Sequence, residues 1–171
     1  MKKPQYIYRA ASMTDIDLRW DKNIADNIGD DRWVAWKNQF IKDNQSMICK
    51  TFVALHGENP IGEGTLIFSP DSSEINGRLE LADNISTVNI NALRMDKKYE
   101  GKGHMSKLMK VMEQYAKDNG YKVVTIGVEA KETRTLAIYL HWGYTEFVTY
   151  GIEDNELALY YSKKLDGSGN S

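Results

Sequence analysis

The chain has 171 residues, about the length of one domain and enough to bury a sizeable core. Hydrophobic residues make up 42% and charged residues 27%, as in ordinary globular proteins, and the formal net charge of −2 argues against a nucleic-acid-binding protein. No apolar run approaches the roughly 18 residues of a membrane span and no leader pattern opens the chain, so we expect a cytoplasmic protein without membrane contact.

The first part of the chain alternates strand and helix signals. The segment Ser12-Met13-Thr14-Asp15 offers capping residues and predicts a helix start. His56 to Pro60 has the composition of a hairpin turn between two strands. The predicted elements are a strand at 5–10, helices at about 15–27 and 31–44, and strands at 47–55 and 61–68.

The second part contains one clear strand-helix-strand unit, at 86–128. The pattern predicts a single α+β domain over 1–165, with a mixed, mostly antiparallel central sheet and flanking helices. A polar tail, 166–171, is predicted to be disordered. The further elements are a loop at 69–84 with a short strand near 78–82, a strand at 86–95, a helix ending at Asn119-Gly120, a strand at 121–128, a helix at 132–142 ended by Gly143, and strands near 144–150 and 156–164.

A glycine-rich junction, Tyr99 to Ser106, separates a predicted strand from a predicted helix. The first turn of a helix leaves backbone N–H groups without partners and carries a partial positive charge, so anionic oxygens bind there. Gly101 and Gly103 have no side chain that would keep the backbone away from a bound anion, and Lys102 adds a positive charge. The junction therefore predicts a phosphate-binding turn; the alternative is a loop that merely turns the chain.

Two known phosphate-binding motifs fit this junction poorly. A mononucleotide P-loop needs Ser or Thr after its Gly-Lys pair, where this chain has Gly103, and Asp96 stands where the first glycine belongs. A dinucleotide fingerprint needs a third glycine where this chain has Ser106, and further strand-helix-strand units are missing. Glu129, at the end of the next strand, would be its ribose ligand, so this second alternative stays open.

Two blocks together resemble the GNAT superfamily of acyl-CoA-dependent N-acyltransferases. Leu93 to Met105 resembles a strand followed by the family pattern Arg/Gln-x-x-Gly-x-Gly/Ala, and Glu132 to Tyr144 resembles Asn-x-x-Ala-x-x-Leu-Tyr-x-x-x-Gly-Phe. The resemblance runs from about 7 to 165, and its specific part is 88–144. Three residues depart from the family pattern: Glu100, Met105 and Glu132.

The resemblance implies that acetyl-CoA is the co-substrate. Its pyrophosphate would bind the backbone amides of 101–106, and its pantetheine arm would pair with the strand edge at Leu93–Met95. The residues implied to bind it are Leu93, Arg94, Met95, Gly101, Lys102, Gly103, His104, Met105, Ser106, Glu132 and Arg134.

The resemblance also places Tyr139 where its phenol would protonate or hydrogen-bond the departing thiolate; the alternative is that its ring only packs under the sheet. The general base stays open between Glu129, Glu80 and a water chain. Asn91, Trp33 and Glu129 are the candidate acceptor-binding residues.

The predicted function is transfer of an acetyl group from acetyl-CoA to a primary amine of a small molecule or peptide, by direct attack in a ternary complex. A surplus of aspartates over 14–31 hints at a cationic acceptor. The alternative function is a noncatalytic acyl-CoA-binding regulatory module. A homodimer is compatible with the sequence.

The cysteine and histidines carry no metal or disulfide signal. Cys49 is the only cysteine, so it cannot form an internal disulfide and is expected to be a small buried apolar side chain. His56, His104 and His141 are scattered without metal-ligand spacing, so no metal is predicted.

Overall fold

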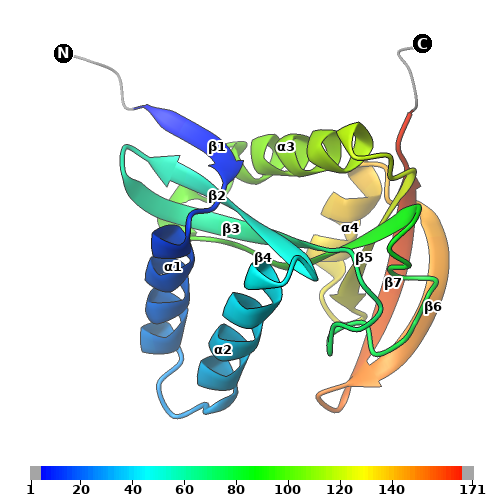
Figure 1. The fold of residues 1–171 in the computed structure, drawn as a ribbon, viewed down its shortest axis with the longest axis horizontal. Coiled ribbons are helices and arrows are strands. Elements are labelled where there is room, and N and C mark those ends of the chain that lie inside the picture. The colour runs from blue at the N-terminus through cyan, green and yellow to red at the C-terminus, as the bar shows by residue number, and fades with distance from the viewer. Residues whose placement is uncertain (1–4, 167–171) are drawn as a thin grey trace. The chain divides into compact units, whose positions relative to one another are not determined.

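The computed structural model describes residues 5–166 (Figure 1). Seven strands of this range form a mixed sheet, accompanied by four α-helices, which confirms the predicted α+β class. The chain forms two compact units. The first unit comprises the residues up to Leu66 together with Ala92–Met112, and the second comprises Ile67–Asn91 together with the residues from Glu113 onward.

The first unit begins with an antiparallel strand pair and two helices (Figure 1). The predicted cap of the first helix is confirmed: the backbone N–H of Asp15 donates to Ser12 Oγ at 3.1 Å, and the Ser12 N–H donates to Asp15 Oδ2 at 2.8 Å. The elements are β1 (Tyr6–Ala10), α1 (Met13–Asp26), α2 (Arg32–Gln45), β2 (Cys49–His56) and β3 (Asn59–Ile67).

Strand β3 carries two glycines on one face and a charged residue on the other. A Cβ on Gly62 would lie 2.6 Å from Met95 Cε and 2.9 Å from the Arg94 carbonyl oxygen, and one on Gly64 would lie 2.8 Å from Leu93 Cδ1. Only glycine permits this close approach to β4 (Thr87–Met95). The side chain between them, Glu63, is buried on the opposite face.

The predicted strand-helix-strand crossover is present, and its residues belong to both units. β4 pairs in parallel with β5 (Val123–Glu129), from Thr87↔Val123 to Ile90↔Ile126. The helix between them, α3 (His104–Asp118), begins in the first unit and ends in the second, and Gly120, with φ +88°, confirms the predicted stop. The remaining elements are α4 (Thr133–His141), β6 (Glu146–Glu153) and β7 (Glu156–Lys164).

One predicted strand is absent from the structure, and one short helix in the structure was not predicted. The short strand near 78–82 does not form, because this segment makes local turns: the N–H of Arg78 donates to the Ile75 carbonyl and the N–H of Leu81 to the Arg78 carbonyl. A short 3-10 helix, η1 (Lys97–Tyr99), precedes the glycine turn and had no sequence signal. Apart from Asp166, the tail predicted to be disordered lies outside the described residues.

Candidate functional site

The turn that opens α3 contains two glycines in a left-handed conformation. Gly101 and Gly103 have φ +74° and +85°, a left-handed backbone that favours glycine, and a Cβ on either would meet nothing within 4 Å. The first helical hydrogen bond runs from the Lys107 N–H to the Gly103 carbonyl, so the amides of 104–106 have no partner within the helix. The oxygens of a pyrophosphate suit this turn for three reasons. Three adjacent backbone amides lack a helical partner, the two glycines leave space on their Cβ side, and the exposed Lys102 supplies a positive charge.

His104 anchors this turn to β1. Its side chain is only 6% exposed, and its Nδ1 lies 2.7 Å from the Tyr8 hydroxyl, while its ring packs on Tyr6 at 4.4 Å between centroids. Burial, with Lys107 and Lys102 nearby, lowers the pKa of His104, so the ring is neutral at pH 7. The sequence placed His104 in the phosphate turn but could not reveal that its side chain holds the turn in position.

A second histidine–tyrosine pair anchors the segment before the turn. His56 Nδ1, at the end of β2, lies 2.6 Å from the Tyr99 hydroxyl of η1. Tyr6 stacks on His56 at 4.8 Å between centroids and therefore contacts both histidines. The loop between β4 and α3 is thus held from both β1 and β2.

In the strand segment predicted to bind the cofactor, Leu93–Met95, the side chains pack within the protein, so the backbone is the part expected to contact the cofactor. Leu93 and Met95 face the β3 glycines, whereas Arg94 points to the other face. Two residues after the last β4–β5 pair, Ala92 has φ +53°, which is uncommon for a residue with a side chain. This left-handed residue interrupts the regular strand just before the segment expected to pair with pantetheine.

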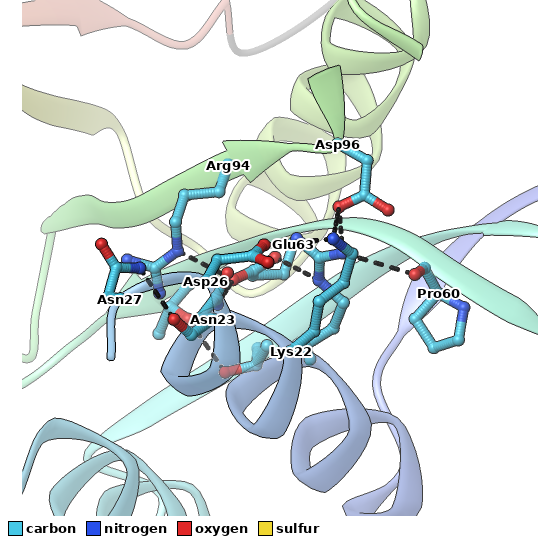
Figure 2. A network of polar contacts seen from close by, with 11 residues as sticks. Lys22, Asn23, Asp26, Asn27, Pro60, Glu63, Arg94 and Asp96 are labelled. Atoms are coloured by element: carbon cyan, nitrogen blue, oxygen red, sulfur yellow. Dashed lines mark hydrogen bonds and ion pairs between the residues drawn. The ribbon is translucent and has the colours of Figure 1, made fainter. Parts of the chain in front are cut away.

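On the other face of β3 and β4 lies a buried ionic network (Figure 2). Glu63 accepts hydrogen bonds from Arg19 Nε at 2.6 Å, Asn23 Nδ2 at 2.7 Å and Arg94 Nε at 2.9 Å, and Arg19 Nη1 also donates to Asp96 at 2.7 Å. Burial lowers the pKa of Arg19, but Glu63 and Asp96 outweigh it and raise the pKa overall. This network was not predicted from the sequence. Its one signal was Glu63 itself, a charged residue within an otherwise buried strand.

Arg94 extends from this network over two tryptophans. Its guanidinium carbon lies 4.8 Å from the ring centroid of Trp20 and 5.0 Å from that of Trp33. Arg94 Nη2 is buried without a hydrogen-bond partner in the part of the chain that the structure describes. Trp33, a candidate acceptor-binding residue, therefore contacts Arg94 directly.

In the second unit, Tyr139 lies on α4, with Glu132 and Arg134 exposed at the start of that helix. Burial raises the pKa of Tyr139 to about 12, so the phenol is protonated at neutral pH. Its ring packs on Trp142 at 5.9 Å between centroids. No residue among 5–166 forms a hydrogen bond with its hydroxyl, which is thus an available donor.

No general base is evident among the candidates. Glu129 has a side chain 44% exposed, 3.7 Å from Lys131 Nζ, and Glu80 is exposed in a turn. Asn91 is partly buried at the end of the paired part of β4. Asn89, two residues earlier, donates to Thr125 Oγ1 at 2.9 Å and holds the two strands together.

Most aspartates of 14–31 form ion pairs, which reduces the negative field expected from their number. The pairs are Arg9–Asp15, Lys37–Asp17, Lys37–Asp21, Lys22–Asp26 and Arg32–Asp30. Burial raises the pKa of Cys49 to about 12, as for a structural thiol. Within residues 5–166, no group of three or more His, Cys, Asp or Glu side chains could hold a metal ion, and no helix is long and apolar enough to cross a membrane.

A parallel strand-helix-strand unit whose helix opens with a left-handed glycine turn is typical of proteins that bind phosphate-bearing coenzymes. The model of the acetyltransferase (GNAT) family matches residues 13–144, and the chain belongs to this family. Its class is therefore that of the acetyl-CoA-dependent N-acetyltransferases. No curated protein sequence matches the chain.

Solved structures of acetyltransferases share the fold. The ribosomal-protein-S18-alanine N-acetyltransferase of Escherichia coli is 12% identical, with a TM-score of 0.64 over 98% of each chain. An Elizabethkingia anophelis GNAT acetyltransferase with acetyl-CoA bound is 16% identical, with a TM-score of 0.60 over 95% of this chain and 100% of that one. A chimera of the Vibrio cholerae spermidine N-acetyltransferase SpeG and hSSAT is 14% identical, with a TM-score of 0.66 over 94% and 96%.

Proposed function

We propose that this protein transfers the acetyl group of acetyl-CoA to a primary amine of a small molecule or peptide, by direct attack in a ternary complex. The observation that carries the proposal is the turn before α3, with two left-handed glycines open on their Cβ side and the free amides of 104–106. Family membership supplies the reaction class.

Each half of the cofactor has a proposed place on the chain. The amides of 101–106 and the Lys102 ammonium bind the pyrophosphate. The backbone edge at Leu93–Met95, after the interruption at Ala92, pairs with the pantetheine arm as an added strand would. Acetyl-CoA supplies an acyl group activated as a thioester.

In the proposed transfer, the amine nitrogen bonds to the acyl carbon, the carbon–sulfur bond breaks, and the Tyr139 hydroxyl donates its proton to the departing thiolate; the Tyr139 phenolate then takes up a proton from solvent, which balances the one that the amine releases. A pKa of about 12 keeps this hydroxyl protonated, and its lack of a hydrogen-bond partner among the described residues leaves it available. The proton of the attacking amine leaves to Glu129, Glu80 or a water chain.

The names of similar proteins include both a peptide acceptor and a small-molecule acceptor. The Escherichia coli relative is named for the alanine of a ribosomal protein, and the chimera for spermidine. For this chain, the aspartates of 14–31 keep a cationic amine among the candidates, although most of them are already paired.

The test compares two glycine variants at opposite ends of α3. Gly103→Val should abolish the thermal shift that acetyl-CoA produces, because the side chain would fill the phosphate space. Gly120→Val is the matched control, since Gly120 has nearly the same φ, +88° against +85°, and equally open surroundings. In the wild type, acetyl-CoA at about 100 times its dissociation constant should add about 2.7 kcal/mol of stability, or roughly 5–10 °C.

A full acetyl-CoA shift in Gly103→Val would refute the assignment of this turn. If Gly103→Val does not fold, Gly103→Ala replaces it, with Gly120→Ala as control. Thiol release from acetyl-CoA with a panel of amines then tests catalysis. Cofactor binding without thiol release for any amine would favour the noncatalytic module.

A further inference from the structure

We propose that Arg94 binds a carboxylate of the acceptor, so that the preferred substrate is an amine that also carries a carboxylate, such as an amino acid. This inference rests on the proposed function and names the substrate class of that same site. Its basis is the pre-set geometry of the Arg94 guanidinium (Figure 2).

The guanidinium is fixed on three sides. Its Nε donates to Glu63 at 2.9 Å, and its carbon lies 4.8 Å and 5.0 Å from the ring centroids of Trp20 and Trp33. The Arg94 side chain is nevertheless 26% exposed. A planar fork that is already immobilised loses little conformational freedom when it binds a ligand.

Most of the N–H donors of the Arg94 guanidinium form no hydrogen bond with residues 5–166. A guanidinium has five N–H donors, and the Nε–H bond to Glu63 is the one that Arg94 makes within residues 5–166. Nη2 is buried and has no partner in the described part of the chain. Buried donors normally have partners, so an unpaired donor on a side chain that is 26% exposed points to a missing acceptor group.

The charge on Arg94 is also incompletely compensated. Glu63 is shared with Arg19 and Asn23, whereas Arg19 has a second carboxylate, Asp96. Among the residues that the structure describes, Arg94 pairs with no carboxylate other than the shared Glu63. The guanidinium fork matches a carboxylate in a bidentate geometry, so an anionic group on the acceptor would supply both the hydrogen bonds and the charge that Arg94 lacks.

The position of Arg94 connects this anion site to the proposed chemistry. Its backbone belongs to the Leu93–Met95 segment proposed to hold the pantetheine arm, and its side chain lies against Trp33, a predicted acceptor-binding residue. An acceptor held by its carboxylate at Arg94 would thus lie beside the strand that carries the acyl donor.

The test measures selectivity within matched pairs of acceptors: phenylalanine against phenethylamine, and lysine against cadaverine. The wild type should favour the carboxylated member of each pair. In Arg94→Gln the ratio of kcat/KM between the members should fall about ten- to hundredfold, the usual effect of losing a hydrogen bond to a charged group. Because the ratio is taken within one variant, any general loss of activity cancels.

Arg9→Gln is the control, since Arg9 pairs with a carboxylate, Asp15, elsewhere in the same unit and should leave the ratio unchanged. Arg94→Lys keeps the charge beside Glu63 but lacks the fork, so it should recover only part of the selectivity. Arg94→Lys also replaces the glutamine variant if that one does not fold. Full selectivity in the lysine variant would refute the bidentate contact.

A second readout needs no turnover. Titration with N-acetylphenylalanine should change the tryptophan fluorescence of the wild type and of Arg9→Gln in a saturable way, because Arg94 lies on two indole rings. Arg94→Gln should not respond, nor should the wild type respond to N-acetylphenethylamine. Transfer to amines without any carboxylate preference would refute this inference but leave the proposed function intact. Absence of transfer to every amine would refute the proposed function, while the titration would still decide the role of Arg94.

Discussion

Replacing Glu63 by glutamine should lower the free energy of unfolding by about 3 kcal/mol. Glu63 is 2% exposed and accepts three hydrogen bonds, two of them from the guanidinium groups of Arg19 and Arg94. Breaking a buried ion pair by removing one partner usually costs about 3–5 kcal/mol, because the remaining charge is left buried without compensation. Glutamine keeps one acceptor oxygen, and Asp96 still pairs with Arg19, so the lower end of that range applies.

Urea unfolding measures this effect, followed by tryptophan fluorescence and far-ultraviolet circular dichroism. Trp20 and Trp33 lie on Arg94, so their emission reports on the network directly. The control is Glu58→Gln, because Glu58 is exposed in the turn between β2 and β3; its unfolding free energy should change by less than about 0.5 kcal/mol.

A double variant separates the ionic contribution from simple packing loss. Arg19→Met combined with Glu63→Leu removes both charges, so it should cost less than the sum of the two single changes, with a coupling of about 0.5–3 kcal/mol. Additive costs, or a loss in Glu63→Gln no larger than in the Glu58 control, would refute the view that Glu63 compensates buried charge.

Two further predictions concern Tyr139 and His104. Tyr139→Phe should lower kcat about 10²- to 10⁴-fold, with little change in acetyl-CoA affinity, because only the hydroxyl is lost; unchanged turnover in single-turnover assays would assign Tyr139 to packing alone. The pKa of His104 is lowered in the folded state, so its neutral form adds stability that is present above the unfolded pKa of about 6.5 and is lost as pH falls through the lower folded value. Melting temperatures at descending pH should therefore fall more steeply in the wild type than in His104→Phe, and equal slopes would contradict the role of His104.

The sequence revealed those features of the fold that depend on neighbouring residues. The glycine turn and the capping box of Ser12 were predictable because backbone conformation and helix caps are set within a few residues. The strand predicted near 78–82 failed because apolar alternation there is produced by Leu79 and Leu81 within consecutive turns. Period-two hydrophobicity over so few residues does not exclude turns.

The ionic network was not predictable, because its partners are far apart along the chain. Arg19 and Glu63 are 44 residues apart, and Glu63 and Arg94 are 31 apart. On the strand before the glycine turn, Asn89 donates a hydrogen bond to Thr125 Oγ1, and Asn91, like Asn89, has no carboxylate that could take up the proton of an amine. Neither the sequence nor the structure therefore identifies the residue that acts as general base.

The anchoring of the glycine turn by β1 has a consequence for the order of folding. Tyr8 and His104 are separated by 96 residues, so the first strand leaves the ribosome long before the histidine that it will hold is synthesised. Loops of this length close slowly, because the entropy of closure is spent before the contact stabilises anything. In a nascent chain, the glycine turn can therefore be anchored to β1 only after more than half of the chain has been made.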